Sequence, residues 1–85
     1  MMKVMLVDDC QLILRGLKSI LDWEANGFCI VGEALNGKQA LDKMENEQVD
    51  ILLTDIQMPV MDGIELIRIV RKKYPDVKIA VLSAY

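Results

Sequence analysis

Short apolar runs alternate along this chain with segments of helical spacing, and this alternation limits the folds that it can adopt. The runs cover residues 3–7, 28–33, 49–54 and 77–82. They are short and largely continuous, which is typical of strands buried on both faces of a parallel sheet. The order strand, helix, strand, helix, strand, helix, strand predicts an α/β fold. Its sheet should be parallel, with right-handed crossovers and helices on both faces.

The predicted helices cover residues 10–22, 38–46 and 64–73. Each carries apolar side chains at helical spacing, so each should bury one face. The residues expected on these faces are Leu12, Ile13, Gly16, Leu17, Ile20 and Leu21 in the first helix, Ala40, Leu41 and Met44 in the second, and Ile64, Ile67 and Val70 in the third.

Polar residues mark the starts of these helices. Asp8 or Asp9 is expected to cap the first helix, where a negative charge also suits the helix dipole. Asn36 with Gly37 opens the second helix, and Asp62 with the glycine after it precedes the third. In the strand at 28–33, the glycine and its flanking glutamate predict a position near the edge of the sheet.

Composition limits the functional class. The 85 residues are 53% apolar and 27% charged, which is typical of one folded soluble domain spanning residues 1–85. The net charge of −3 argues against direct binding of nucleic acid. No stretch approaches the ~18 apolar residues of a membrane span, and the apolar N-terminus is too short for a signal peptide. We therefore expect a cytoplasmic protein without membrane contacts.

The residue types that are scarce exclude further chemistry. The chain has no histidine, which excludes histidine catalysis and the usual zinc sites. Its two cysteines, Cys10 and Cys29, form neither a disulfide framework nor a metal-binding spacing.

Carboxylates end two of the predicted strands. Asp8 and Asp9 follow the first strand, and Asp55 ends the strand at 49–54, with Pro59 shortly after it. Ligands bind at the carboxyl ends of strands in open α/β sheets, so these acids converge if the two strands are neighbours. Each pair at ~5 Å would cost on the order of 3 kcal/mol at an effective dielectric near 20. An oxygen-only cluster of this kind suits Mg²⁺ or Mn²⁺. Alternatively, Asp55 only caps a turn.

A divalent ion at this edge would allow phosphoryl chemistry. It would screen an incoming phosphoryl group from the carboxylates, and Asp55 could act as the nucleophile and form an acyl phosphate. Ser83 ends the fourth predicted strand, so its hydroxyl could reach a phosphoryl oxygen. The alternative for Ser83 is a hydroxyl bonded to the nearby backbone.

At these residues the chain resembles the receiver domain of bacterial two-component response regulators, the CheY-like, flavodoxin-type three-layer sandwich. The resemblance covers the whole chain. The motifs that carry it are Val7-Asp8-Asp9, Asp55-Ile56-Gln57-Met58-Pro59, Met61-Asp62-Gly63 and Leu82-Ser83-Ala84.

The resemblance implies a role for each matching residue. Asp55 would be the phosphoacceptor and a metal ligand. Asp9 would bind Mg²⁺ directly, Asp8 would act largely through water, and the backbone carbonyl of Gln57 would be the third protein ligand. Ser83 would be the switch hydroxyl that moves towards the phosphoryl group.

The resemblance also implies partners. A sensor histidine kinase would supply the phosphoryl group, and an output region, DNA-binding in related regulators, would receive the signal. Trp23-Glu24, Gly32-Glu33-Ala34 and Asn36-Gly37 are similar to receivers attached to AraC-type DNA-binding regions. The chain would not be an enzyme beyond catalysing its own phosphotransfer and dephosphorylation.

The chain departs from the family pattern at two places. Cys10 stands where many receivers carry an acid. The sequence also stops at Tyr85, whereas a full receiver continues with a helix, a fifth strand bearing an invariant lysine, and a last helix. The resemblance therefore implies a receiver truncated after the fourth strand. That strand would become an apolar edge, so we expect self-association through residues 77–85.

Other functions stay open at this point. An interaction-only or dimerising fragment that is not phosphorylated is the main alternative. A phosphatase of the aspartyl-phosphate type would have a second acid two residues after Asp55, where Gln57 stands. A nucleotide-binding module would have a glycine-rich turn after the first strand, where the acids stand instead.

Overall fold

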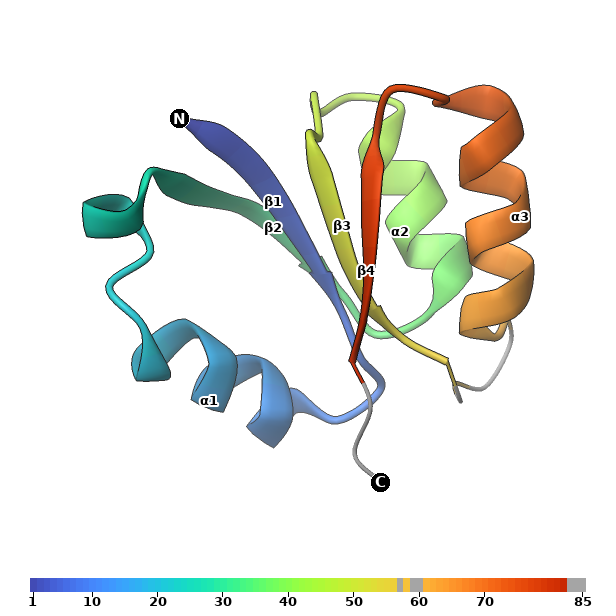
Figure 1. The fold of residues 1–85 in the computed structure, drawn as a ribbon. Coiled ribbons are helices and arrows are strands. Elements are labelled where there is room, and N and C mark those ends of the chain that lie inside the picture. Colours follow the sequence, from blue (N-terminus) through green and yellow to red (C-terminus); the bar gives the residue numbers. More distant parts are fainter. Residues whose placement is uncertain (57, 59–60, 83–85) are drawn as a thin grey trace.

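The protein is described here from a computed structural model that covers residues 1–56, 58 and 61–82. Strands and helices alternate along the chain, as the sequence predicts (Figure 1). The elements are β1 (Met2–Val7), α1 (Gln11–Ile20), a 3-10 turn η1 (Glu24–Asn26), β2 (Phe28–Ala34), α2 (Gly37–Met44), β3 (Ile51–Asp55), α3 (Gly63–Lys73) and β4 (Lys78–Leu82).

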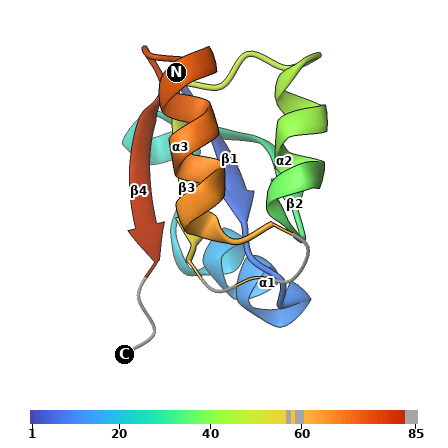
Figure 2. The same cartoon turned by 90° about the vertical axis from the view of Figure 1, so that its right-hand side faces the viewer.

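The strands form one parallel sheet in the order β2-β1-β3-β4. Helix α1 lies on one face of the sheet, and α2 and α3 lie side by side on the other (Figures 1 and 2). The predicted three-layer α/β architecture is therefore confirmed. The prediction that β2 lies at a sheet edge is also confirmed, because its one strand neighbour among the described residues is β1.

Alternate residues of the central strands supply two apolar cores. Met5 of β1 and Leu52 of β3 point towards α2 and α3, where they pack with Leu66 and Val70. The intervening β1 residues, Val4 and Leu6, pack on the opposite face with Leu14 of α1. The two sets follow the twofold alternation of side chains along a strand.

The predicted apolar face of the first helix is wrong in most of its members. Leu14, which was not predicted, is the one buried residue of α1, and Leu17 packs beside it. The helix also ends at Ile20, two residues earlier than predicted. Leu14 and Leu17 are about one turn apart, so they lie on the same side of the helix and pack on the sheet together. The predicted core residues that are exposed instead are Leu12, Ile13, Ile20 and Leu21.

The prediction for the third helix is correct for Val70, which is completely buried, but wrong for Ile64, and it missed Leu66. Leu66 is completely buried, whereas Ile64 is 55% exposed. Gly63, Leu66 and Val70 share the buried face because they are three and four residues apart. Ile64 is one residue past Gly63, about 100° around the helix, and so it points away from the sheet. In α2 the predicted inward residues Ala40 and Met44 are buried.

Side chains cap α2 and α3 as predicted. The side-chain oxygen of Asn36 accepts a hydrogen bond from the backbone N–H of Gln39 at 2.9 Å. Asp62 accepts one from the backbone N–H of Glu65, also at 2.9 Å. Each bond satisfies an N–H group that has no partner within its helix.

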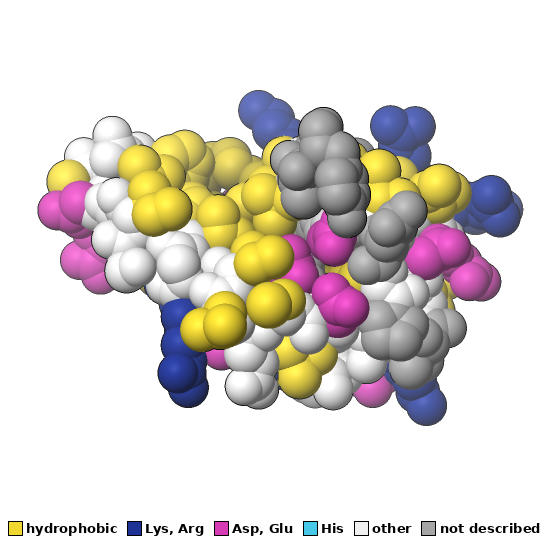
Figure 3. Space-filling model, turned by 90° about the horizontal axis from the view of Figure 1, so that it is seen from below, with side chains coloured by type: hydrophobic (Ala, Val, Ile, Leu, Met, Phe, Trp, Pro, Cys, Tyr) yellow, Lys and Arg dark blue, Asp and Glu magenta, His cyan; other side chains and the backbone are white. Residues whose placement is uncertain are grey.

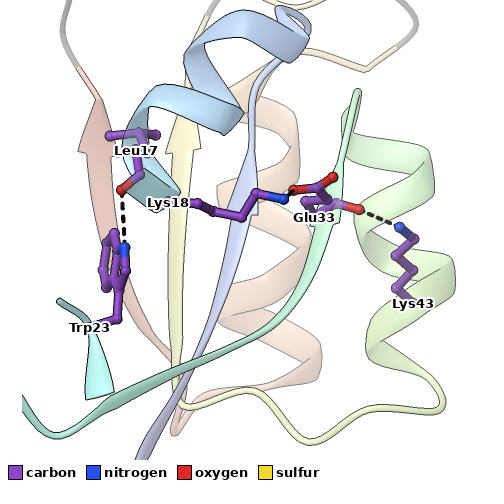
Figure 4. Close-up of polar contacts among 5 residues, drawn as sticks. All are labelled: Leu17, Lys18, Trp23, Glu33 and Lys43. Carbon is purple, nitrogen blue, oxygen red and sulfur yellow. Dashed lines mark hydrogen bonds and ion pairs between the residues drawn. The ribbon is translucent and has the colours of Figure 1, made fainter. Parts of the chain in front are cut away.

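Polar contacts connect the edge strand β2 to helices on both faces of the sheet (Figure 4). Lys18 Nζ of α1 lies 2.8 Å from Glu33 Oε2, and Lys43 of α2 donates a hydrogen bond to the backbone carbonyl of Glu33. Trp23 Nε1 donates to the carbonyl oxygen of Leu17 at 3.0 Å, which links the connection after α1 to the helix.

A search of the described residues for membrane spans found no candidate helix.

Candidate functional site

Three carboxylates meet at the carboxyl end of the sheet. The register pairs Val7 of β1 with Thr54 of β3, so Asp8 and Asp55 follow at neighbouring positions. Asp9 is the next residue along the chain. One oxygen from each of Asp8, Asp9 and Asp55 lies within 4.8 Å of the others. The predicted convergence of these acids is therefore confirmed for the described residues. Figure 3 views this end of the molecule and shows acidic side chains gathered near its centre.

The three acids differ in their access to solvent. Asp8 is only 3% exposed, Asp9 is exposed, and Asp55 is half-buried. The cluster is therefore accessible to solvent at Asp9 and buried at Asp8. A small ion or group can enter from solvent and contact carboxylate oxygens at the ends of the strands.

Backbone N–H groups orient two of the carboxylates. Asp8 Oδ1 accepts a hydrogen bond from the N–H of Cys10 at 2.9 Å. This bond lies one residue before α1, and no side chain caps that helix, so the predicted capping of the first helix by Asp8 or Asp9 is wrong. Asp55 Oδ1 accepts from the N–H of Ile56 at 2.7 Å. These bonds limit the rotation of both side chains.

The environment of Asp8 disfavours its charge. Burial raises the pKa of the Asp8 carboxyl above its usual value of 3.8, and the nearby Asp55 and Asp9 raise it further. The Cys10 N–H acts in the opposite sense but does not cancel these effects. Neither of the two ion pairs between described residues, Lys18 with Glu33 and Lys73 with Glu45, involves these acids. Among the described residues, the negative charge of the cluster is therefore not neutralised by an ion pair.

This donor set fits a hard divalent cation. Mg²⁺ prefers oxygen ligands and is usually held by one or two carboxylates together with water and substrate phosphate. Asp8, Asp9 and Asp55 offer oxygen alone, and no imidazole or thiolate lies among the three. Such a site could bind an ion and place it beside the Asp55 oxygen that does not accept from the Ile56 N–H.

Two predicted site residues, Gln57 and Ser83, lie outside the described residues, so their roles stay predictions.

Two further residues, which the sequence pattern did not indicate, adjoin the site. Thr54 is buried and donates from Oγ1 to the carbonyl of Asp55, and Gly63 contacts the same peptide from the start of α3. The sequence did contain a signal for Gly63, because this glycine directly follows Asp62, which caps α3.

Comparisons with known proteins agree with one family. A family model described as the response regulator receiver domain matches residues 4–85. The transcriptional regulatory protein YesN of Bacillus subtilis, itself uncharacterised, is 42% identical over the whole chain. The chemotaxis protein CheY of Thermotoga maritima is 39% identical over 96% of the chain. The chain spans 23% of the length of YesN and 67% of that of CheY.

Solved structures give the same result. The receiver domain of AraT, a response regulator from Geobacillus stearothermophilus, superposes with a TM-score of 0.88 at 35% identity. That match covers 94% of this chain and 62% of the AraT chain. A two-component transcriptional regulator AraC from Clostridium phytofermentans superposes with a TM-score of 0.91, also at 35% identity, over 100% of this chain and 66% of its own.

Proposed function

This chain belongs to the response regulator receiver domain family of two-component systems, and we propose that Asp55 is its phosphoacceptor. The observation that carries the proposal is the cluster in which oxygens of Asp8, Asp9 and Asp55 lie within 4.8 Å of one another. Asp55 ends a central strand, where a parallel sheet presents its ligand-binding edge. A half-buried carboxylate in this position can attack phosphorus from a fixed direction.

The proposed reaction moves a phosphoryl group to Asp55. A carboxylate oxygen of Asp55 forms a bond to phosphorus while the bond from phosphorus to the donor breaks, and the donor atom keeps that electron pair. The Ile56 N–H binds Asp55 Oδ1 at 2.7 Å, which leaves Oδ2 as the attacking atom. The product is an acyl phosphate, a known covalent role for aspartate.

Mg²⁺ or Mn²⁺ is the proposed cofactor. Asp8, Asp9 and Asp55 would hold it, with the backbone carbonyl of Gln57 as a further ligand by family resemblance. Such an ion would neutralise negative charge on the group being transferred. The Cys10 N–H orients the Asp8 carboxylate through a hydrogen bond. Because Asp8 is buried, its negative charge is unfavourable without a cation nearby. By the same resemblance, Ser83 is the proposed switch hydroxyl for the new phosphoryl oxygens.

The proposed partners follow from the relatives. A sensor histidine kinase would donate the phosphoryl group, and an output region would receive the signal. YesN is a transcriptional regulatory protein, which supports a DNA-binding output region. The acidic receiver, with its net charge of −3, would not bind DNA itself. The proposed location is the cytoplasm, and the proposed catalysis is limited to the chain's own phosphotransfer and dephosphorylation.

Phosphoryl uptake tests the proposal directly. The protein is incubated with Mg²⁺ and acetyl phosphate, and its intact mass is measured. Asp55→Asn is measured beside it, together with Asp42→Asn as a matched control at an exposed position of α2. We expect one phosphoryl group on the parent and on Asp42→Asn, and none on Asp55→Asn. Folded parent protein that gains no mass would contradict the proposal.

A second function, self-association without phosphorylation, is favoured by β4. Among the described residues this strand has one strand neighbour, β3, and its Val81 is 44% exposed. Unpaired edges of this kind can join another chain, and an edge lysine opposes such pairing. We propose that copies associate through this strand, with Val81→Lys monomeric and Ile64→Lys on α3 unchanged. A monodisperse monomer of the parent in light scattering at tens of micromolar would contradict this.

A further inference from the structure

Gly63, the first residue of α3, lies directly against the peptide group that joins Asp55 to Ile56. Its N–H donates a hydrogen bond to the carbonyl oxygen of Ile56 at 2.6 Å. A Cβ atom at position 63 would lie 2.6 Å from Ile56 Cα, 2.9 Å from the Asp55 carbonyl carbon, and closer still to the Asp55 carbonyl oxygen. All three are backbone atoms, which cannot rotate away as a side chain can.

Space rather than backbone conformation accounts for this glycine. Among the described residues, Gly27 is the glycine with a positive φ, at 85°, and Gly63 has ordinary helical geometry. Alanine would suit a first helical position by propensity, because it loses less conformational freedom than glycine. The close approach of two backbones is therefore the reason for glycine here.

The peptide that Gly63 contacts also orients the Asp55 carboxylate. The carbonyl group of Asp55 and the N–H of Ile56 belong to one planar unit, so they move together. That N–H holds Asp55 Oδ1 at 2.7 Å. A shift of the peptide away from position 63 would therefore carry the hydrogen-bond donor with it and turn the carboxylate away from Asp8 and Asp9.

We propose that Gly63 is a positioning residue for Asp55, because it lets the start of α3 seat the Asp55–Ile56 peptide and thereby aims the carboxylate into the acidic cluster. This inference rests on the proposed function, since it assigns a role in the reaction of Asp55. It makes the contact between α3 and the end of β3 part of the reactive geometry, in addition to the acids themselves.

Two other glycines give a graded comparison. At Gly37 a Cβ would meet atoms of the Met61 side chain at 2.8 to 3.0 Å, and that side chain can rearrange. At Gly16 in α1 nothing lies within 4 Å. Gly16→Ala is therefore the matched control, because it makes the same chemical change in a helix without a collision.

The experiment uses the whole chain in three variants: Gly63→Ala, Gly16→Ala and Asp62→Ala. Asp62→Ala removes the cap of α3 but leaves the Gly63 contact, so it reports the effect of a weaker helix start alone. The measurements are the Ile56 amide resonance, Mg²⁺ affinity, and the rate of phosphoryl uptake from acetyl phosphate. Circular dichroism at low temperature confirms that each variant is folded.

We expect Gly63→Ala to shift the Ile56 amide resonance, to weaken Mg²⁺ binding, and to slow phosphoryl uptake by about a hundredfold, the scale of a misplacement near 1 Å. Gly16→Ala and Asp62→Ala should keep the parent's rate. A Gly63→Ala protein with the parent's Ile56 resonance and rate would overturn the inference, as would an equal loss in Asp62→Ala.

If Gly63→Ala does not fold, Mg²⁺ is titrated into the parent: the Gly63 amide resonance should move with those of Asp55 and Ile56, and a Gly63 resonance that stays fixed would overturn the inference. If the parent takes up no phosphoryl group, the proposed function fails. The Ile56 resonance of Gly63→Ala still decides whether Gly63 positions Asp55.

Discussion

Carboxylate oxygens of Asp8 and Asp55 lie within 4.8 Å of each other at the ends of the neighbouring strands β1 and β3. The pairing of Val7 with Thr54 brings them together, so the sheet itself enforces the approach. Like charges this close repel, and Asp8 has little solvent to screen it. The fold thus keeps a locally unfavourable arrangement, which is typical of functional sites.

Replacing Asp8 by asparagine should stabilise the metal-free protein. Asn keeps an oxygen for the Cys10 N–H but removes the buried negative charge. We expect Asp8→Asn to raise the free energy of unfolding by about 0.5–2 kcal/mol without Mg²⁺. Chemical denaturation with and without Mg²⁺ measures this.

The same variant should lose the response to metal. For the parent, Mg²⁺ at ten times its Kd should add about 1.4 kcal/mol, because the ion binds the folded state alone. Asp42→Asn, at an exposed acid on α2, should keep the parent's response. Equal Mg²⁺ stabilisation of the parent and Asp8→Asn would show that Asp8 is not part of an ion site.

The pH dependence of stability should carry the signature of Asp8. Its pKa is raised in the folded state, so the folded protein still holds a proton at pH values where the unfolded chain has lost it. The contribution of Asp8 to stability is therefore full below its unfolded-state pKa and is lost as the pH rises through the folded-state pKa.

The difference between Asp8→Asn and the parent isolates this contribution. Without metal, the advantage of Asp8→Asn should be largest near neutral pH and should shrink as the pH falls through the folded-state pKa of Asp8. Urea unfolding of both proteins from about pH 7 to pH 3 measures it. An advantage that grows towards acid pH would contradict a raised pKa.

Two apolar residues of α3 should differ sharply when shortened. Leu66 is completely buried, so Leu66→Ala should cost about 2–5 kcal/mol of unfolding free energy through lost burial and a cavity. Ile64 is 55% exposed on the same helix, and Ile64→Ala should stay within about 0.5 kcal/mol. Comparable losses in the two variants would mean that the buried face of α3 is assigned incorrectly.

The contacts of Figure 4 should also differ in strength. Trp23→Phe removes the hydrogen bond to Leu17 and should cost about 1 kcal/mol, although the ring contact with Phe28 is kept. Lys18→Gln removes an ion pair whose side chains are 42% and 44% exposed, and should cost less than about 1 kcal/mol. Thermal unfolding of both variants tests the order.

Local pattern was enough to predict the fold class. The buried strands read as short apolar runs, and Asn36 and Asp62 cap α2 and α3 as their positions suggest. The buried faces were harder to predict. In α3, apolar residues surround Leu66 on both sides along the chain, so spacing alone does not choose the face. In α1, the choice depends on how the helix crosses the sheet.

The acidic cluster was predictable only in part. Asp8, Asp9 and Asp55 stand out because each follows an apolar run, and strand adjacency then joins them. Which acid is buried, and which backbone N–H groups hold it, depends on the local path of the chain after each strand. The contact of Gly63 with the Asp55–Ile56 peptide depends on where α3 starts in space, so it became visible only in the structure.

Mapping the phosphoryl group tests the central claim most directly. Protein treated with acetyl phosphate, in Mg²⁺ or in excess chelator, is reduced with borohydride, which converts an aspartyl phosphate to homoserine, and its peptides are then sequenced by mass spectrometry. We predict homoserine at position 55 in Mg²⁺ and at no position in chelator. Homoserine at a different aspartate, or equal conversion of Asp55 without the metal, would contradict the account.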